Sequence, residues 1–198
     1  MIAYKGFNKK LCSVMGDGKK ETCQFKLGET KKVDSSKTAR SGFHCCENPF
    51  ECLSYYALNG ENRFFKVEAA GDIDEDATER IACTQITLLE ELTPLQFALE
   101  GMKYIISHPD RQKWQQNHGS VSVKKDKAIA KEKGCIAIAR GKDPKVAGPE
   151  GSILGMIVEN KTGIIQCKLF VVNTEQAGKL FRLTDDRELE VVDEEKES

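Results

Sequence analysis

Apolar and polar residues alternate along much of the first ninety positions, which is the pattern of half-buried β-strands. The segments expected to form strands are 2–7, the two arms of a hairpin within 11–25, 42–46, 63–73 and 80–89. A turn at Gly16-Asp17-Gly18 should join the arms of the hairpin. In the last segment the apolar positions change from odd to even numbers near Gln85, which predicts an irregularity there.

Two stretches carry the signals of a helix start. Asn48-Pro49-Phe50-Glu51 predicts a helix over residues 49–58, with Asn48 as its cap. Thr93-Pro94-Leu95-Gln96 repeats this chemistry and predicts a second helix that ends near Ser107. The buried stripe of the second helix is expected to be Leu95, Leu99, Met102 and Ile106.

Beyond residue 119, short runs of small and apolar residues recur every nine positions. These runs are Ala128-Ile129-Ala130, Ala137-Ile138-Ala139, Val146-Ala147-Gly148 and Gly155-Met156-Ile157. Glycine-containing or charged turns separate them, which is typical of stacked β-solenoid coils, and a plain β-meander would give the same pattern. A hairpin with arms at 153–159 and 164–173 is expected to follow.

The predicted fold class is therefore α+β. An N-terminal domain over residues 1–110 should hold a mixed β-sheet and two helices, and a polar connector should follow at 111–119. A β-rich region, solenoid-like or a meander, is expected at 120–192. An acidic tail at 193–198 ends the sequence.

Charge and composition narrow the range of functions. The chain has 30 basic and 31 acidic residues, so its balanced charge gives no reason to expect nucleic acid as a partner. Neither a secretion signal nor an apolar run long enough for a membrane span is visible, so we expect a protein of the cytoplasm with no membrane partner. Without a secretion signal, the eight cysteines are expected to be free thiols.

The stretch SGFHCCENPFEC at residues 41–52 concentrates His44, Cys45, Cys46 and Cys52. Zinc prefers four converging ligands, usually from Cys-x-x-Cys knuckles, and no such knuckle is present. Adjacent cysteines on a strand point to opposite faces, so both could hardly bind one ion. No metal is therefore expected, and no cofactor either, because a Gly-rich phosphate loop in a strand–helix context is missing.

A Cys–His nucleophile pair is a second interpretation of this stretch, since His44 and Cys46 share one strand face. Nothing else in the sequence indicates acyl transfer. The third interpretation is architectural: Phe43 and Cys45 face the core, and a neutral His44 bonds a backbone group near the strand-to-helix turn. The positive end of the helix capped by Asn48 would favour that neutral form.

Four segments together resemble an uncharacterised family of phage and prophage proteins. They are AYKGF, SGFHCCENPFECLSYY, RFFKVEAAGDI and RIACTQITL, and the resemblance covers residues 1–110. Members of that family often continue into glycine- and alanine-rich β repeats. The resemblance implies a viral or prophage origin and the cytoplasm of a bacterial host cell, and it implies no established activity.

The order of three segments is also similar to that of ADP-ribosyltransferases. These are Lys5-Gly6, then Gly42 to Cys45 with Tyr55-Tyr56, then Val67 to Asp72. This similarity implies His44, Tyr55 and Glu68 as candidate catalytic residues. Lys5 stands where that family uses His or Arg to hold the nicotinamide dinucleotide, His44 stands near the family's tyrosine, and no glutamate motif appears on a later strand.

Three functions follow from these observations. The first is a phage accessory protein that binds a host bacterial protein, for example to inhibit a defence system such as CRISPR. The second is an ADP-ribosyltransferase-like enzyme. The third is a structural module that forms homo-oligomers through its C-terminal β region. Neutral charge and the missing catalytic motifs favour the first, non-enzymatic function.

Overall fold

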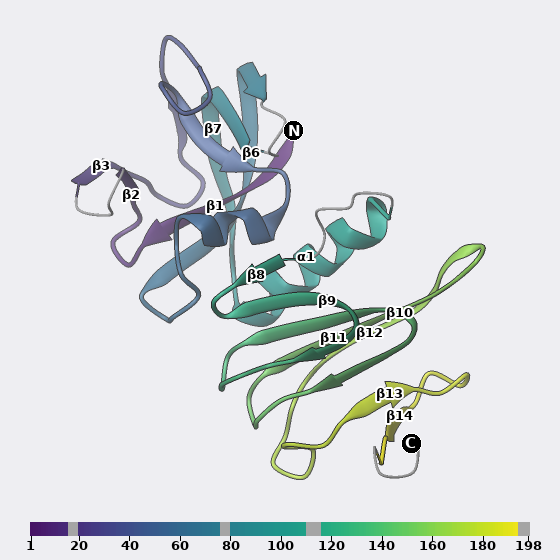
Figure 1. The fold of residues 1–198 in the computed structure, drawn as a ribbon. Helices are drawn as coiled ribbons and strands as arrows, with labels where there is room; N and C mark the ends of the chain where they lie inside the picture. The colour runs from purple at the N-terminus through teal and green to yellow at the C-terminus, as the bar shows by residue number, and fades with distance from the viewer. Residues whose placement is uncertain (16–19, 76–79, 110–115, 194–198) are drawn as a thin grey trace. The chain divides into compact units, whose positions relative to one another are not determined.

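The computed structural model describes residues 1–15, 20–75, 80–109 and 116–193 (Figure 1). The chain divides into two compact units, Met1–Phe97 (unit 1) and Ala98–Ser198 (unit 2). In chain order the elements are β1 (Ile2–Asn8), β2 (Cys12–Met15), β3 (Lys20–Gln24), β4 (Thr30–Lys32), β5 (Phe43–Cys46), the 3-10 helix η1 (Pro49–Ser54), β6 (Asn62–Glu75), β7 (Arg80–Leu92), α1 (Pro94–Ser107), β8 (Gln116–His118), β9 (Val121–Ile129), β10 (Ile136–Ala147), β11 (Ile153–Asn160), β12 (Gly163–Val171), β13 (Phe181–Leu183) and β14 (Leu189–Val191).

The fold is mainly β, and the predicted α+β class is wrong. The described residues form fourteen strands, against one α-helix and one short 3-10 helix. The predicted helix over 49–58 is only the six-residue η1. Its cap is confirmed, because the Asn48 side chain accepts a hydrogen bond from the Phe50 N–H at 3.0 Å.

Tertiary packing explains why η1 is short. The Tyr56 ring lies against Gly6 of β1, where an added Cβ would come within 2.5 Å of the ring. The Tyr56 hydroxyl accepts a hydrogen bond from the Val14 N–H of β2 at 2.9 Å. These contacts take the chain off a helical path after Ser54, and local capping chemistry cannot reveal them.

The bounds predicted for α1 are confirmed, and so is its start. The Thr93 N–H donates to Gln96 Oε1 at 2.9 Å, and the Gln96 N–H donates to Thr93 Oγ1 at 3.3 Å. The predicted buried stripe is wrong in part, since Leu95 and Leu99 are about 40% exposed. The buried side chains of α1 include Phe97, Ala98, Met102 and Ile105.

The strands of unit 1 close into a small antiparallel barrel. β1 pairs with β5 and β6, and β7 pairs with the same two strands, so the ring β5–β1–β6–β7 has no open edge. β4 pairs with β7 next to the stretch that β5 occupies. Every pairing in this sheet is antiparallel, which corrects the predicted mixed sheet.

The barrel interior is aromatic and aliphatic. Its buried members are Ala3, Phe7, Phe25, Phe43, Cys45, Phe65, Val67, Ala69, Ile81, Cys83, Ile86 and Leu88. The Phe7 ring centroid lies 5.0 Å from that of Phe25 and 5.5 Å from that of Phe65. These distances are typical of favourable aromatic pairs, so the interior of unit 1 is a closely packed core.

The irregularity predicted near Gln85 is confirmed. The register of β6 against β7 shifts between Ala70 and Ile73, opposite Gln85 and Cys83. Gly71 sits at the shift with φ +77°, a conformation that other residues rarely adopt. The hairpin of β2 and β3 is also confirmed, although its predicted turn at Gly16-Asp17-Gly18 lies outside the described residues.

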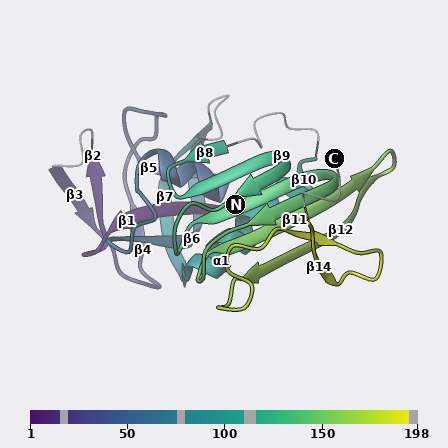
Figure 2. The same ribbon diagram turned by 60° about the horizontal axis from the view of Figure 1, so that its bottom comes forward.

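In unit 2, β9, β10 and β11 lie side by side and parallel (Figures 1 and 2). Ile136 of β10 pairs with Val121 on one side and with Ile153 on the other, as successive coils of a solenoid would. Ala128 pairs with Val146, which belongs to the run two repeats further along the chain. One coil therefore contains two of the nine-residue repeats. Parallel pairing differs from a plain meander, whose neighbouring strands are antiparallel.

The strands that follow β11 pair antiparallel with their neighbours. β12 pairs antiparallel with β11, which confirms the predicted hairpin, and β13 pairs with β10 and β14. A bidentate ion pair joins β10 to β11, because Arg140 donates to both carboxylate oxygens of Glu159, at 2.7 and 2.6 Å.

The connector predicted at 111–119 and the acidic tail at 193–198 fall largely outside the described residues. None of the described helices has the length and apolarity needed to span a membrane.

Candidate functional site

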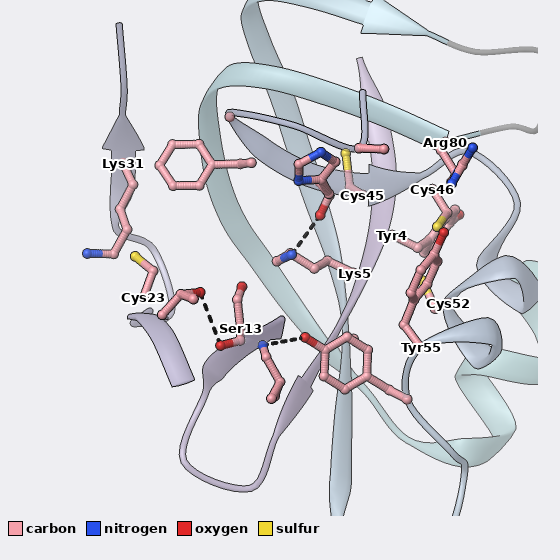
Figure 3. A pocket seen from close by; sticks show the side chains of 18 of the residues that line it. Tyr4, Lys5, Ser13, Cys23, Lys31, Cys45, Cys46, Cys52, Tyr55 and Arg80 are labelled. Carbon is pink, nitrogen blue, oxygen red and sulfur yellow. Dashed lines mark hydrogen bonds between the residues drawn. The ribbon is translucent and has the colours of Figure 1, made fainter. Parts of the chain in front are cut away.

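A pocket of about 820 Å³ lies in unit 1 (Figure 3). Its lining comes from β1 to β5, from the loop between β4 and β5, from η1, from Tyr55 and Tyr56 just after it, and from Arg80 at the start of β7. Strand pairing in the barrel and the hydrogen bond between Tyr56 and Val14 hold these segments next to one another, so the fold positions the pocket lining.

Lys5 is positioned by the alternation of β1. Side chains two apart on a strand share a face, and Ala3 and Phe7 are fully buried in the barrel core. Lys5 lies between them on the same face and is only 7% exposed. The strand that supplies two core residues therefore carries an amine into the pocket (Figure 3).

The surroundings of the Lys5 amine are mostly apolar. Its Nζ donates a hydrogen bond to the His44 carbonyl oxygen at 2.6 Å and lies 5.3 Å from the centre of the Phe7 ring and 6.0 Å from that of Phe25. Burial lowers the pKa of the Lys5 amine below its ordinary value, and nearby thiols, that of Cys45 foremost, oppose this effect. Conversion of the ammonium to the neutral amine therefore costs less free energy at Lys5 than at a surface lysine.

The pocket lining is cationic. Lys5, Lys31, Lys32, Arg40 and Arg80 all contribute, and the described lining residues include no aspartate or glutamate. The whole chain, by contrast, has nearly equal numbers of basic and acidic residues. Lys31 also forms an ion pair with Glu29 at 3.4 Å, and Glu29 is not part of the lining.

His44 projects from β5 and is half-buried. Burial lowers its pKa first, the charges of Lys5 and Arg80 lower it further, and a hydrogen bond with the backbone of Lys37 opposes them. The imidazole is therefore neutral at pH 7, as predicted from the sequence, but the cause is burial and two nearby cations rather than the positive end of a helix. Its Nε2 is buried, with no hydrogen-bond partner within the described parts of the chain.

Phe43, Cys45, Cys46 and Cys52 of the stretch 41–52 are also buried and line the pocket. Phe43 and Cys45 lie in the barrel interior, as predicted. All eight cysteines of the chain are free. A hydrogen bond with Cys83 and burial raise the pKa of Cys45 well above its ordinary value, and a hydrogen bond with Cys52 does the same for Cys46. These two thiols therefore stay protonated near neutral pH.

Two of the three catalytic candidates lie in the pocket and one does not. His44 and Tyr55 line it, and the Tyr55 side chain is 58% exposed. Glu68 is exposed on β6, paired with Ile2 and Thr87, and is not part of the lining. Among the described residues, no group of three or more His, Cys, Asp or Glu side chains could hold a metal ion.

Two carboxylates of β6 hold the loop between β4 and β5 that lines the pocket. Asp74 accepts hydrogen bonds from the Thr38 N–H at 2.6 Å and from Lys37 Nζ at 3.1 Å. Asp72 accepts from the Ser36 hydroxyl at 3.1 Å. The bonds from Thr38 are the main reason that the pKa of Asp74 falls to about 2. The loop is therefore fixed to the barrel wall by charged groups outside the pocket.

The comparison with protein families agrees with this division of the chain. Residues 1–100 match the family described as a domain of unknown function (DUF7666). The chain belongs to this family. The match includes all of unit 1, so the pocket lies within the DUF7666 domain. No curated protein and no solved structure gives a significant match.

Proposed function

We propose that the DUF7666 domain of this protein is a binding domain for a small anionic molecule. The observation that supports this most is the pocket lining, which includes five cationic residues and, in its described part, no aspartate or glutamate. The volume of about 820 Å³ lies within the range of small-molecule sites.

Electrostatics gives the reason. Cations that line one pocket repel one another, and the repulsion is stronger where burial lowers the effective dielectric constant. An anion that enters the pocket relieves this repulsion and accepts charge-assisted hydrogen bonds of roughly 1.5–3 kcal/mol each. Tyr55 offers an accessible ring in the same pocket, so an anion with an aromatic group fits the lining well.

The second candidate is a dinucleotide site like that of ADP-ribosyltransferases. The pocket brings together Lys5, His44 and Tyr55, which are the residues that this similarity singled out at the N-terminal side. Glu68 lies elsewhere, and the described lining contains no carboxylate for a catalytic glutamate's role. The arrangement thus favours binding of a dinucleotide, itself an aromatic anion, over transfer of its ADP-ribose.

The broader proposals concern the protein's biological setting. An origin in a phage or prophage, binding of a host protein and inhibition of a host defence system stay predictions from the sequence, as does self-association through the C-terminal β region. A pull-down from bacterial lysate with the full chain would test the host partner, and one stoichiometric partner would support it. Recovery of the chain alone, as a monomer, would count against both host binding and self-association.

Two dyes of matching shape test the anion proposal. 8-Anilinonaphthalene-1-sulfonate and N-phenyl-1-naphthylamine share their ring system, and only the first carries a charge. We expect the full chain to bind the sulfonate about tenfold or more tightly than the neutral amine, which corresponds to at least one charge-assisted hydrogen bond. Fluorescence titration in low salt measures both affinities.

Matched variants locate the site. Arg80→Gln removes a cation of the lining, whereas Lys9→Gln removes an exposed cation whose partner is Glu61, away from the pocket. Arg80→Gln should reduce the preference for the sulfonate severalfold, and Lys9→Gln should leave it unchanged. Equal affinity for the two dyes, or a preference that both variants lower equally, would contradict an anion site in this pocket.

A further inference from the structure

We propose that Lys5 captures a carbonyl group of the bound anion as a Schiff base. This inference rests on the proposed function, because the anion supplies the molecule that carries the carbonyl. The ligand class is a small aldehyde or ketone with a phosphate or carboxylate group.

The position of Lys5 supports covalent capture. Its amine is the innermost cation of the lining, placed there by the core-facing register of β1. The other four cations come from β4, from the loop after it and from Arg80, which starts β7. Charges at those places can hold the anionic group of a ligand while its carbonyl reaches the Lys5 amine in the same pocket (Figure 3).

The amine has few competing interactions. Within the described residues its one hydrogen-bond acceptor is the His44 carbonyl, a neutral group, and no carboxylate of the lining could hold it as a salt-bridged ammonium. Two aromatic rings and the barrel core surround it. A lysine desolvated in this way is the kind of amine that proteins use for Schiff-base chemistry.

Two thiols of the same pocket, those of Cys45 and Cys46, are poorer nucleophiles. A thiol reacts as its thiolate, and hydrogen bonds within the pairs Cys45–Cys83 and Cys46–Cys52 together with burial keep Cys45 and Cys46 protonated. His44 is neutral and has a buried Nε2. The Lys5 amine is thus better prepared than these two thiols and His44 to attack a carbonyl carbon.

The step balances with water as the only other product. The ammonium first gives one proton to solvent, and the nitrogen lone pair forms a bond to the carbonyl carbon while the oxygen takes up a proton. The carbinolamine then loses its hydroxyl as water, which leaves a carbon–nitrogen double bond. Protonation of that imine restores the cation at the position of the Lys5 ammonium, and no oxidant or reductant is needed.

Pyridoxal 5′-phosphate is a suitable probe, because it combines an aldehyde with a phosphate on one ring. The full chain is incubated with the probe at equimolar concentration and reduced with borohydride, and the modified lysine is identified by mass spectrometry of peptides. We expect one probe per chain, attached at Lys5. Lys5→Arg keeps the charge and removes the nucleophile, so it should abolish this adduct, whereas Lys9→Arg, at an exposed ion pair outside the pocket lining, should retain it.

Pyridoxine 5′-phosphate, which has no aldehyde, separates this inference from the proposed function. If both phosphates bind but reduction leaves Lys5 unmodified, the Schiff base is refuted and the anion site stands. Labelling spread over surface lysines such as Lys9, with Lys5 unmodified, also refutes it. If Lys5 is labelled equally well by pyridoxal, which lacks the phosphate, capture is correct and the anion site is wrong.

Discussion

Replacement of Lys5 by methionine should change how the stability of the protein depends on pH. Methionine has a similar length and no charge, so it suits the space between Phe7 and Phe25. In the wild-type chain the pKa of the Lys5 amine is lowered by burial, so between that folded-state pKa and the ordinary value near 10.5 the unfolded state binds more protons. Stability from this group therefore rises with pH across that window and is lower below it.

The size of the effect follows from proton linkage. The free energy of unfolding of the wild type should gain up to about 1.4 kcal/mol per pH unit relative to Lys5→Met inside the window. The lost hydrogen bond to the His44 carbonyl adds a term of roughly 1–3 kcal/mol that hardly depends on pH. The quantity to measure is therefore how the difference in free energy of unfolding between wild type and Lys5→Met changes with pH. The sign of that difference at a single pH is not decisive.

Urea unfolding of both proteins at pH 7, 8, 9 and 10 gives this difference. The titratable groups that act on Lys5 are the thiols of Cys45, Cys46, Cys52 and Cys83, and the raised pKa values of Cys45 and Cys46 keep those two protonated over most of this range. Lys9→Met, at an exposed ion pair, serves as the control. A difference between wild type and Lys5→Met that stays constant from pH 7 to 10 would refute the account of Lys5 as a buried amine.

Four further predictions concern the stability of unit 1 and the role of His44. Asn48→Ala should lower the free energy of unfolding by roughly 0.5–2 kcal/mol through loss of the cap on η1, and an unchanged urea midpoint would contradict this. Gly71→Ala should be more destabilising than Gly28→Ala, because both positions have φ near +76° but only at Gly71 would the new Cβ meet a side chain, that of Thr84; equal midpoints would argue against it. Asp74→Asn should lower the free energy of unfolding above pH 3.8 and have little effect near pH 2. The folded-state pKa of Asp74 is about 2, so the stability that its carboxylate contributes is lost as pH falls from 3.8 toward 2. The urea midpoints of wild type and variant should therefore converge near pH 2. His44→Gln should keep the fold and change sulfonate affinity by less than about threefold, because the neutral ring supplies no charge; a loss of binding with an unchanged melting temperature would make His44 a direct ligand contact.

Local patterns predicted most elements of the fold. The strands β1, β5, β6 and β7, the cap at Asn48 and the bounds of α1 all follow from alternation and capping within a few residues. The fold class failed because capping signals show where a helix begins but not how far it continues. The length of η1 is limited by Tyr56, whose contacts with Gly6 and Val14 join residues far apart in sequence.

The same limit applies to the repeats of unit 2. A nine-residue spacing is visible in the sequence, but which runs pair depends on where the chain turns. The pairing of Ala128 with Val146 shows that alternate runs stack. Only the strand register in three dimensions reveals this, because small apolar residues would fit either arrangement.

The site was predicted only in part. The sequence pointed to His44 and Tyr55, which line the pocket, and to Glu68, which does not. A signal for Lys5 was present in the alternation of β1, where a lysine occupies an inward position between Ala3 and Phe7. The clustering of Arg40, Arg80 and the lysines of β4 around it could not be predicted, because barrel closure brings these distant segments together.

Binding of small anions by the DUF7666 domain should depend on the cations of one pocket. The most direct measurement is the ratio of affinities of the full chain for 8-anilinonaphthalene-1-sulfonate and for the neutral N-phenyl-1-naphthylamine, in low and in high salt. We expect a preference of about tenfold or more for the sulfonate in low salt. This preference should decrease as salt screens the charges, and Arg80→Gln should reduce it. A ratio near one that depends neither on salt nor on Arg80 would contradict it.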